Sequence, residues 1–340
     1  MRAPDFWYRM PAGPLAAALA PAAWAWRMVT ERRWRQARPW TPPVPVICIG
    51  NVVAGGAGKT PVALSLGERL AARGVRLHFL SRGHGGSLAG PVRVDPDRHT
   101  AADVGDEPLL LAAAAPAWVS RDRPAGIRAA VAAGATAVVM DDGFQNPSVA
   151  KSLSLLVVDG RRGFGNGFII PAGPLREPVV SALARAYAVV LMGPDEAGVG
   201  ATVGGQRPVL RAHLKPAPEA SALAGRRVLA FAGIGHPQRF FDTLHDLGAR
   251  VVASRAFADH HRYGTAEVDA LLRQARVLDA LPVTTVKDAV RIPEERRAQV
   301  TALPVIVNWE SEPALDRVLE TVLAPVLPPV LPPVLTTHAR

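Results

Sequence analysis

A glycine-rich stretch, IGNVVAGGAGKTP at residues 49–61, follows directly on the apolar run VPVICI. An apolar run that leads through glycines into Lys-Thr is typical of a strand, a phosphate-binding loop and a helix. In such a loop the backbone N–H groups face the phosphates, and the lysine reaches the β- and γ-phosphates. The residues predicted to bind the nucleotide are Gly55, Gly56, Ala57, Gly58, Lys59 and Thr60.

The loop departs from two standard patterns. The motif G-x-x-x-x-G-K-[ST] requires glycine at position 53, where this chain has Val53. The partitioning-type ATPases have a lysine just before the glycines, where this chain has Ala54. A tight turn with a chance Lys-Thr pair is the alternative. Only four of the 39 basic residues are lysines, so a lysine at position 59 favours the nucleotide site.

Short apolar segments alternate with helical patterns over the first two thirds of the chain. Expected strands lie at 44–50, 75–81, 136–143 and 153–160, and expected helices at 60–74 and 126–134. This alternation predicts an α/β fold of the P-loop NTPase type, in which helices cover both faces of a mainly parallel sheet. The polar segments GGAGKT, SRGHGG, DDGFQ and DGRRGFGNG end the strands, at the edge where open parallel sheets bind ligands.

A segment rich in Gly, Pro and Ala at 193–226 predicts a domain boundary, and a second alternating unit begins at RRVLAFAGIG. We therefore expect a P-loop kinase domain at 39–205 and a smaller α/β domain at 206–325. The tail 326–340 continues a proline repeat that cannot form a helix, and we expect it to be extended and disordered.

Residues 1–38 form a basic and aromatic N-terminal segment. The apolar run at 10–26 is interrupted by three prolines and is short for a membrane span, which needs about 20 apolar residues. The segment carries seven arginines against two acidic residues. We therefore expect a membrane-associating helix with Trp24, Trp26 and Trp34 at headgroup level. An ordinary helix packed on the domain is the alternative, and a signal peptide would leave the nucleotide loop outside the cell.

Composition limits the other classes of function. Apolar residues make up 49% of the 340 residues, as in a globular protein, and the formal charge is +10. The cations are dispersed arginines without an aromatic-basic recognition motif, which argues against nucleic-acid binding. Cys48 is the one cysteine, which excludes an intramolecular disulfide and a multi-cysteine metal site and suits a reducing compartment.

Phosphoryl transfer also needs carboxylates for a metal and for the acceptor's proton. Asp141 and Asp142 end the apolar strand TAVVM, where a magnesium-binding carboxylate is expected; a simple turn is the alternative. Asp106 and Glu107 precede the helical pattern LLLAAAA, where acidic residues also serve as helix caps. His260 and His261 lie beside Asp259, and their pattern alone favours a solvated pair or a capped core histidine.

Eight ordered blocks closely resemble the tetraacyldisaccharide 4'-kinase family, the lipid A 4'-kinases of Gram-negative bacteria. They span about residues 40–310, and they are IGNVVAGGAGKTPV, LSRGHGG, VGDEPLLL, DDGFQ, VVDGRRGFGNGFIIPAGPLREP, FAGIGHPQRFF, FADHHRY and VTTVKDAVR. The resemblance implies transfer of the γ-phosphate of ATP to the 4'-hydroxyl of a tetraacylated glucosamine disaccharide 1-phosphate. It also implies Mg²⁺ and peripheral attachment to the cytoplasmic face of the inner membrane, where the lipid substrate lies.

The same resemblance implies roles for individual residues. Lys59 and Thr60 would hold the phosphates and the metal, with Asp141 and Asp142 as the metal-side carboxylates. Asp106 resembles the family's general base and His260 its partner. Arg82 of the SRG block would meet charge in the transition state or the phosphate of the lipid.

Three positions depart from the family pattern, which usually has tyrosine, histidine and glutamate where this chain has His84, Asn146 and Val286. None of them replaces a predicted catalytic or metal-binding residue. A regulatory P-loop ATPase with a basic membrane tether remains the alternative function, because a phosphate loop alone does not identify the acceptor. The sequence indicates neither a nucleic acid nor a protein as partner.

Overall fold

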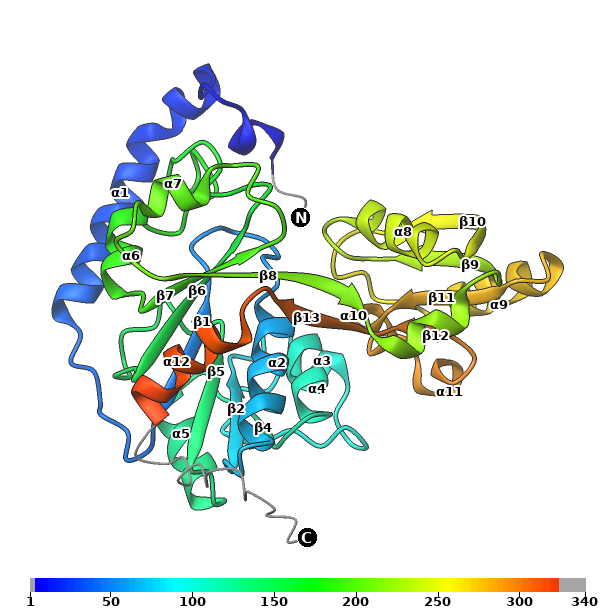
Figure 1. Ribbon diagram of the computed structural model, residues 1–340, viewed down its shortest axis with the longest axis horizontal. Helices are drawn as coiled ribbons and strands as arrows, with labels where there is room; N and C mark the ends of the chain where they lie inside the picture. Colours follow the sequence, from blue (N-terminus) through cyan, green and yellow to red (C-terminus); the bar gives the residue numbers. More distant parts are fainter. Residues whose placement is uncertain (1–3, 324–340) are drawn as a thin grey trace, which may run out of the picture.

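Two β-sheets organise the chain in the computed structural model, which describes residues 4–323. Figure 1 shows them in a larger and a smaller unit, joined by two strands that cross between the units. The tail 326–340, predicted to be disordered, lies outside the described residues. The helices are η1 (Asp5–Tyr8), α1 (Pro14–Gln36), α2 (Lys59–Ala71), α3 (Ala101–Val104), α4 (Asp106–Ala112), α5 (Arg123–Ala132), α6 (Val179–Arg185), α7 (Val199–Val203), η2 (Pro218–Leu223), α8 (Pro237–Asp246), α9 (Thr265–Val277), α10 (Val286–Ala289), α11 (Glu294–Arg297) and α12 (Glu312–Leu323).

The larger sheet has nine strands in the order β13-β8-β7-β6-β1-β5-β2-β4-β3. Its strands are β1 (Val46–Gly50), β2 (Leu77–Ser81), β3 (Val92–Arg93), β4 (Ala117–Val119), β5 (Ala137–Asp141), β6 (Leu153–Asp159), β7 (Ala188–Met192), β8 (Val209–Pro216) and β13 (Val305–Trp309). All pairs are parallel except β13 with β8 and β3 with β4, at the two edges. The predicted mainly parallel sheet is confirmed.

Burial explains why the central strands read as unbroken apolar runs. Every residue of β1, β5, β6 and β7 is buried, because helices cover both faces of the sheet. Alternate residues of β1 enter different cores. Ile47 and Ile49 pack with α2, α4 and α12, whereas Val46 and Cys48 pack with α5, α6 and α7.

The smaller sheet is parallel and has four strands in the order β10-β9-β11-β12. Its strands are β9 (Arg227–Ala232), β10 (Arg250–Ala256), β11 (Leu281–Thr285) and β12 (Thr301–Leu303). Phe240 and Leu244 of α8 pack on one face, and Val268 and Leu271 of α9 pack on the other. The chain therefore repeats the strand-helix alternation expected from RRVLAFAGIG onward.

The chain enters the smaller unit through β8 and leaves it through β13 (Figure 1). These two strands pair antiparallel and belong to the larger sheet. After β13, α12 returns to the larger unit, where Asp316 accepts hydrogen bonds from Arg69 of α2 and from Arg73, two residues after the end of α2. Residues 209–216 and 305–323 thus lie with the larger sheet, although the predicted range of the smaller domain, 206–325, includes them.

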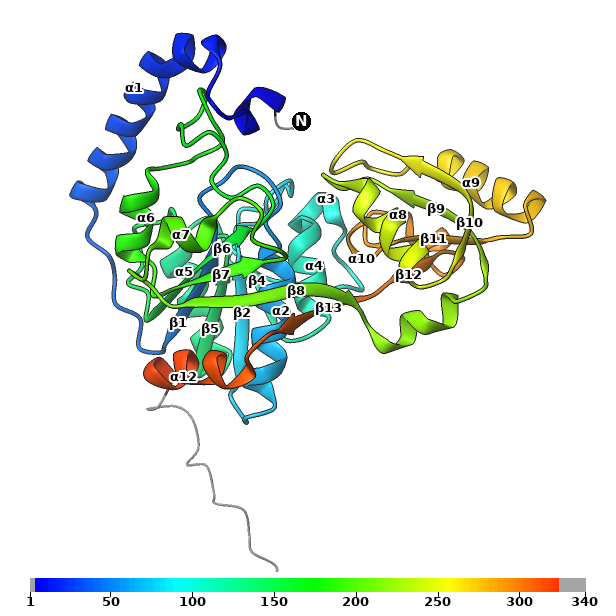
Figure 2. The same cartoon turned by 45° about the horizontal axis from the view of Figure 1, so that its top comes forward.

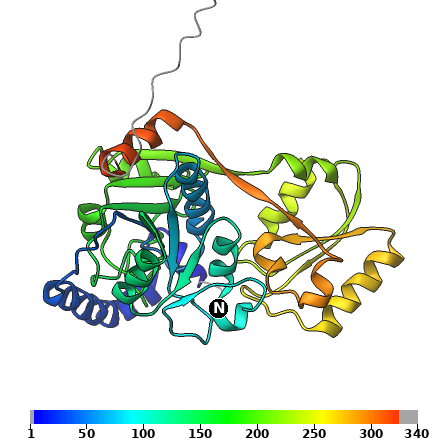
Figure 3. The same cartoon turned by 90° about the horizontal axis from the view of Figure 1, so that it is seen from below.

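Helix α1 lies along the outside of the larger unit, on the side away from the smaller unit (Figures 2 and 3). Ala16 and Ala23, two helical turns apart, are its buried residues. Trp24 and Trp26 are 65% and 51% exposed. Trp34 is half-buried, and the guanidinium of Arg185 lies 4.1 Å from the centroid of its ring. No helix within residues 4–323 is both long enough and apolar enough to cross a bilayer.

Candidate active site

The predicted phosphate loop connects β1 to α2. Gly55 and Gly58 have φ angles of +125° and +87°, a region that side chains with a Cβ rarely adopt. A Cβ added at Gly55 or Gly56 would meet no atom within 4 Å, so the backbone of the loop is open to a ligand. Lys59 is the first residue of α2, which places the helix N-terminus behind the loop.

Asn51, which the sequence analysis missed, fixes the shape of this loop. Its fully buried side chain donates hydrogen bonds to the carbonyl oxygens of Val53 at 2.7 Å and Gly55 at 3.2 Å. Its Oδ1 accepts a hydrogen bond from Lys59 Nζ at 3.3 Å. A polar residue directly after the fully buried strand β1 was the signal in the sequence.

Asp141 ends β5 beside the loop. Thr60 Oγ1 donates a 3.0 Å hydrogen bond to Asp141 Oδ2, whereas Asp141 Oδ1 is buried without a partner among the described residues. Burial raises the pKa of Asp141 to about 6, and the charges of Asp142 and Glu107 act in the same direction. A buried, unpartnered carboxylate oxygen beside a threonine hydroxyl fits a divalent cation, which prefers hard oxygen ligands.

Asp142 faces the cations of the site. Its Oδ1 lies 3.6 Å from Lys59 Nζ and 3.3 Å from Arg176 Nη1. Burial alone would raise the pKa of Asp142, but the charges of Lys59 and Arg176 outweigh it and lower the pKa. Asp142 has a φ of +52°, which bends the chain so that both carboxylates border the loop.

Arg176 and Glu177 belong to the PLREP block, for which the sequence analysis gave no role. Arg176 Nη1 also approaches Gln145 Oε1 at 3.3 Å, and Gln145 Nε2 donates to the backbone oxygen of Asn51 at 2.8 Å. Glu177 accepts hydrogen bonds from Gln145 and Arg185. These contacts tie the strand-end segments to the phosphate loop.

Asp106 and His260 meet across the two units, as the family resemblance implied. Asp106 is the first residue of α4, and its Oδ2 lies 3.0 Å from His260 Nδ1. Arg291, which the sequence analysis did not single out, donates to the same oxygen through Nε at 2.8 Å and through Nη2. Burial would raise the pKa of Asp106, but His260 and Arg291 outweigh it and lower the pKa to about 2.

Glu107 lies beside Asp106 and forms a second ion pair between the units, 2.8 Å from Lys287 Nζ. Asp106, Glu107 and His260 place their ligand atoms within 4.8 Å of one another. Both carboxylates already have a cationic partner, so these residues fit a metal less well than Thr60 and Asp141 do. Helix α4 packs against α2, and the charge of Glu107 raises the pKa of Asp141. The two groups of carboxylates are therefore neighbours.

Arg82 is exposed and forms no hydrogen bond or ion pair among the described residues. Its charge acts on Arg123, a buried arginine that the sequence analysis missed. Arg123 Nη1 donates to the Ser120 carbonyl, while its Nε is buried and has no partner within residues 4–323. Burial, with a smaller effect from Arg82, lowers the pKa of Arg123 to about 10.

The three departures from the family pattern have different surroundings. The His84 and His260 ring centroids lie 6.5 Å apart, so His84 borders the Asp106–His260 pair. Asn146 Oδ1 accepts a hydrogen bond from the Ser148 backbone at 2.8 Å and serves a turn. Val286 begins the short helix α10. His261 Nε2 lies 2.6 Å from Glu267 Oε2.

Comparison with known proteins gives one consistent family. Residues 15–324 match the family model described as tetraacyldisaccharide-1-P 4'-kinase. A tetraacyldisaccharide 4'-kinase of Rhodospirillum centenum is 63% identical over 94% of this chain and 96% of its own length. One from Rhodospirillum rubrum is 52% identical over 94% of this chain and 97% of its own. The crystal structure of LpxK from Aquifex aeolicus in complex with ATP has a TM-score of 0.74 and 26% identity, covering 91% of this chain and 99% of that one.

Proposed function

The chain belongs to the tetraacyldisaccharide-1-P 4'-kinase family, and we propose how its residues carry out that reaction. The protein is an ATP-dependent kinase that transfers the γ-phosphate of ATP to the 4'-hydroxyl of tetraacyldisaccharide 1-phosphate in lipid A biosynthesis. One observation carries the assignment of its site. The phosphate loop leads into α2, and α2 packs against α4, which begins with Asp106, the partner of His260.

The loop residues 55–58 and Lys59 bind the triphosphate. Their backbone N–H groups and the Lys59 ammonium supply positive charge where the β- and γ-phosphates lie. Thr60, Asp141 and Asp142 would hold Mg²⁺, the two carboxylates directly or through water. When bound, Mg²⁺ neutralises the charge that develops on the phosphate oxygens. Asn51 keeps Lys59 beside the loop through its 3.3 Å hydrogen bond.

Asp106 accepts the proton of the sugar hydroxyl. Its low pKa keeps the carboxylate ionised at neutral pH. A loose transition state makes modest demands on the strength of the base, so positioning the hydroxyl matters most. His260 orients Asp106 through their 3.0 Å contact. The exposed guanidinium of Arg82 meets negative charge on the transferred phosphoryl group or on the lipid.

Both units contribute to this site, which supports a division into a P-loop kinase domain and a smaller C-terminal domain. Lys59, Thr60, Asp106 and Asp141 come from the larger unit, and His260 comes from the smaller one. The strand pairing favours a smaller domain that begins after β8 and ends before β13. The predicted range, 206–325, included both of these strands.

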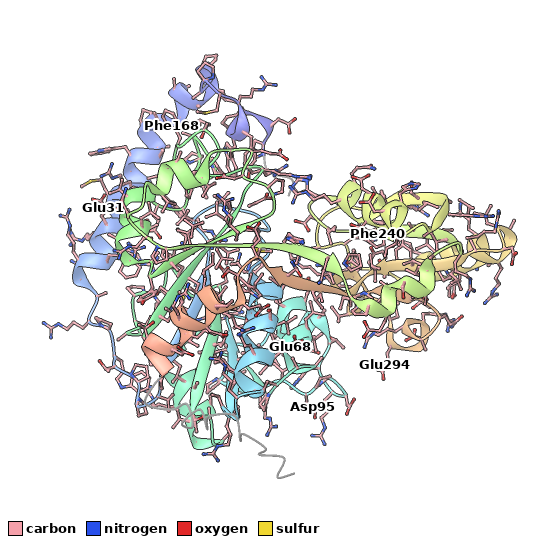
Figure 4. The ribbon with its side chains drawn as sticks, viewed as in Figure 1. Glu31, Glu68, Asp95, Phe168, Phe240 and Glu294 are labelled. Carbon is pink, nitrogen blue, oxygen red and sulfur yellow. The ribbon has the colours of Figure 1, made fainter. Side chains whose placement is uncertain are left out.

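Helix α1 binds peripherally to the cytoplasmic face of the inner membrane. Its exposed apolar side chains support this proposal, and they are Leu15, Trp24, Trp26, Met28 and Val29. Phe168, which is 37% exposed, lies at the same end of the molecule as α1 and far from Phe240 of the smaller unit (Figure 4). The positive charge of residues 1–38 favours an anionic surface and an anionic lipid substrate.

A transfer assay tests the function. Purified protein, Mg²⁺ and ATP labelled in the γ-phosphate are incubated with the disaccharide lipid, and the product is separated from inorganic phosphate. We expect label in the lipid at the 4' position. Release of labelled inorganic phosphate alone, whatever lipid is present, would instead indicate a regulatory ATPase.

A further inference from the structure

Arg291 links the smaller unit to the carboxylate of Asp106 in the larger unit. Its side chain is 2% exposed, and it lies two residues after the end of α10. Nε and Nη2 donate to Asp106 Oδ2, and Nη1 donates to the Gly233 carbonyl at 2.9 Å and to Asp288 Oδ1 at 3.0 Å. All three nitrogens of this guanidinium therefore have acceptors, which fixes its plane.

Asp288 anchors Arg291 independently of Asp106. The Asp288 side chain is fully buried and accepts hydrogen bonds from the Gly233 backbone at 3.1 Å and from Thr285 Oγ1 at 2.7 Å. Tyr263 OH adds a third at 3.2 Å. The smaller unit thus presents a guanidinium that is already oriented toward the larger unit.

The two oxygens of Asp106 have different surroundings as a result. Oδ2 receives both nitrogens of Arg291 and also contacts His260 Nδ1. Oδ1 forms no hydrogen bond among the described residues, and the Asp106 side chain keeps 12% of its surface exposed. Rotation of the carboxylate would break the three contacts of Oδ2, so Oδ1 is the oxygen left to meet an acceptor hydroxyl.

We propose that Arg291 is a positioning residue for phosphoryl transfer, which holds Asp106 through Oδ2 so that Oδ1 accepts the proton of the sugar hydroxyl. This inference rests on the proposed function. The O–H bond of the acceptor breaks as its oxygen bonds to the γ-phosphorus. The proton goes to Asp106 Oδ1, and ADP leaves with the electrons of the broken P–O bond.

Other charged groups around Asp106 cannot replace Arg291. His260 touches the same oxygen, but its imidazole is neutral unless protonated. Lys287 of α10 has Glu107 as its direct partner at 2.8 Å. Removal of the guanidinium therefore leaves a buried carboxylate with weaker support for its charge and with freedom to turn.

The test compares Arg291→Gln and Arg291→Lys with Arg239→Gln. The control removes another ion pair between the units, Arg239 to Asp159 at 3.0 Å. We expect kcat for lipid phosphorylation to fall about 10- to 100-fold in both Arg291 variants, with KM for ATP changed less than about threefold. The kcat of the wild type and of the control should stay level down to pH 5, whereas the Arg291→Gln profile should decline on the acidic side. Lysine cannot span Asp106 and Gly233 together, so it should not restore kcat.

Two further measurements separate positioning from folding. In Arg291→Ala, added guanidinium should restore part of kcat. In an Asp106→Asn background, the further loss of Arg291 should lower kcat less than about threefold.

The inference is overturned if the wild type is active and the Arg291 variants keep kcat within threefold at every pH. An equal loss in the Asp106→Asn background would also overturn it. A wild type that leaves the lipid unphosphorylated refutes the proposed function instead. If Arg291→Gln does not fold, Arg291→Lys and guanidinium rescue decide the outcome.

Discussion

Asp141 accepts a 3.0 Å hydrogen bond from Thr60 through one carboxylate oxygen while its other oxygen is buried without a partner within the described chain. This arrangement stabilises the protein poorly by itself, because an ionised carboxylate in the interior needs compensating partners. A bound cation supplies that compensation. The pair therefore connects metal binding to the stability of the fold.

Asp141→Asn should separate these two properties. The neutral amide can keep an oxygen toward Thr60 and removes the buried charge, so the metal-free protein should gain about 1 to 3 kcal/mol of stability. Lipid phosphorylation should fall at least about 100-fold, because the metal-side carboxylate is lost. Urea unfolding with EDTA and the transfer assay measure the two effects. A variant that keeps the wild-type rate would contradict the metal role.

Lys59→Met should lower kcat at least about 100-fold, because the ammonium acts where charge develops on the β- and γ-phosphates. Lys215→Met is the matched control. Lys215 is exposed and bonds Asn308 at 2.7 Å on the strand pair β8–β13, far from the loop in sequence. The transfer assay with both variants gives the comparison. Full-speed transfer by Lys59→Met would refute the phosphate site.

Asn51→Ala should raise KM for ATP about 10- to 30-fold, since the loop and Lys59 both lose a hydrogen-bond partner. The effect on kcat should be smaller than that of Lys59→Met, because the ammonium remains. Asn308→Ala removes a half-buried asparagine on β13 and serves as the control. Nucleotide titration followed by fluorescence or calorimetry measures the affinity. An unchanged affinity would show that the loop keeps its shape without Asn51.

Asp106 should make stability depend on pH in the acidic range. Burial opposes its ionisation, but His260 and Arg291 lower its pKa to about 2, below the unfolded value of about 3.9. A lowered pKa adds stability above pH 4, and that stability is lost as the pH falls toward 2. With partial solvent screening, the contribution is about 1 to 2 kcal/mol. The stability difference between wild type and Asp106→Asn should therefore be constant from pH 5 to 8 and should shrink below pH 4. A difference that grows on acidification would reverse the assigned sign.

Replacement of both Trp24 and Trp26 by serine should weaken binding to anionic vesicles by at least about tenfold, because two large exposed side chains of α1 are lost. Leu15 and Met28 would still contribute, so some binding should remain. Val277→Ser on α9 is the control, since Val277 is 86% exposed in the smaller unit. Vesicle co-sedimentation measures the partition. Equal partitioning of all three proteins would favour the alternative that α1 is an ordinary helix packed on the domain.

The sequence predicts the parts of the site that follow local rules. The strand, the glycines and Lys-Thr are contiguous, and Asp141 directly ends a buried run, so each could be assigned from its neighbours. Arg291 and Asp106 are 185 residues apart, and only the apposition of the two units brings them together. The stacking of Trp34 on Arg185 depends on tertiary structure and could not be predicted from the N-terminal segment alone. For the same reason the return of β13 to the larger sheet escaped prediction, since strand order is not encoded in any single strand.

The two ends of the smaller unit are neighbours, because Ala217 N donates a 3.0 Å hydrogen bond to the Pro304 carbonyl next to the β8–β13 pair. A gene in which residues 218–303 were replaced by a tight turn would therefore still encode every pairing partner of the nine-stranded sheet. In evolutionary terms the protein resembles a nucleotide-binding core into which an acceptor-side module has been spliced at a hairpin. A module joined in this way could be replaced without removing any strand of the nine-stranded sheet.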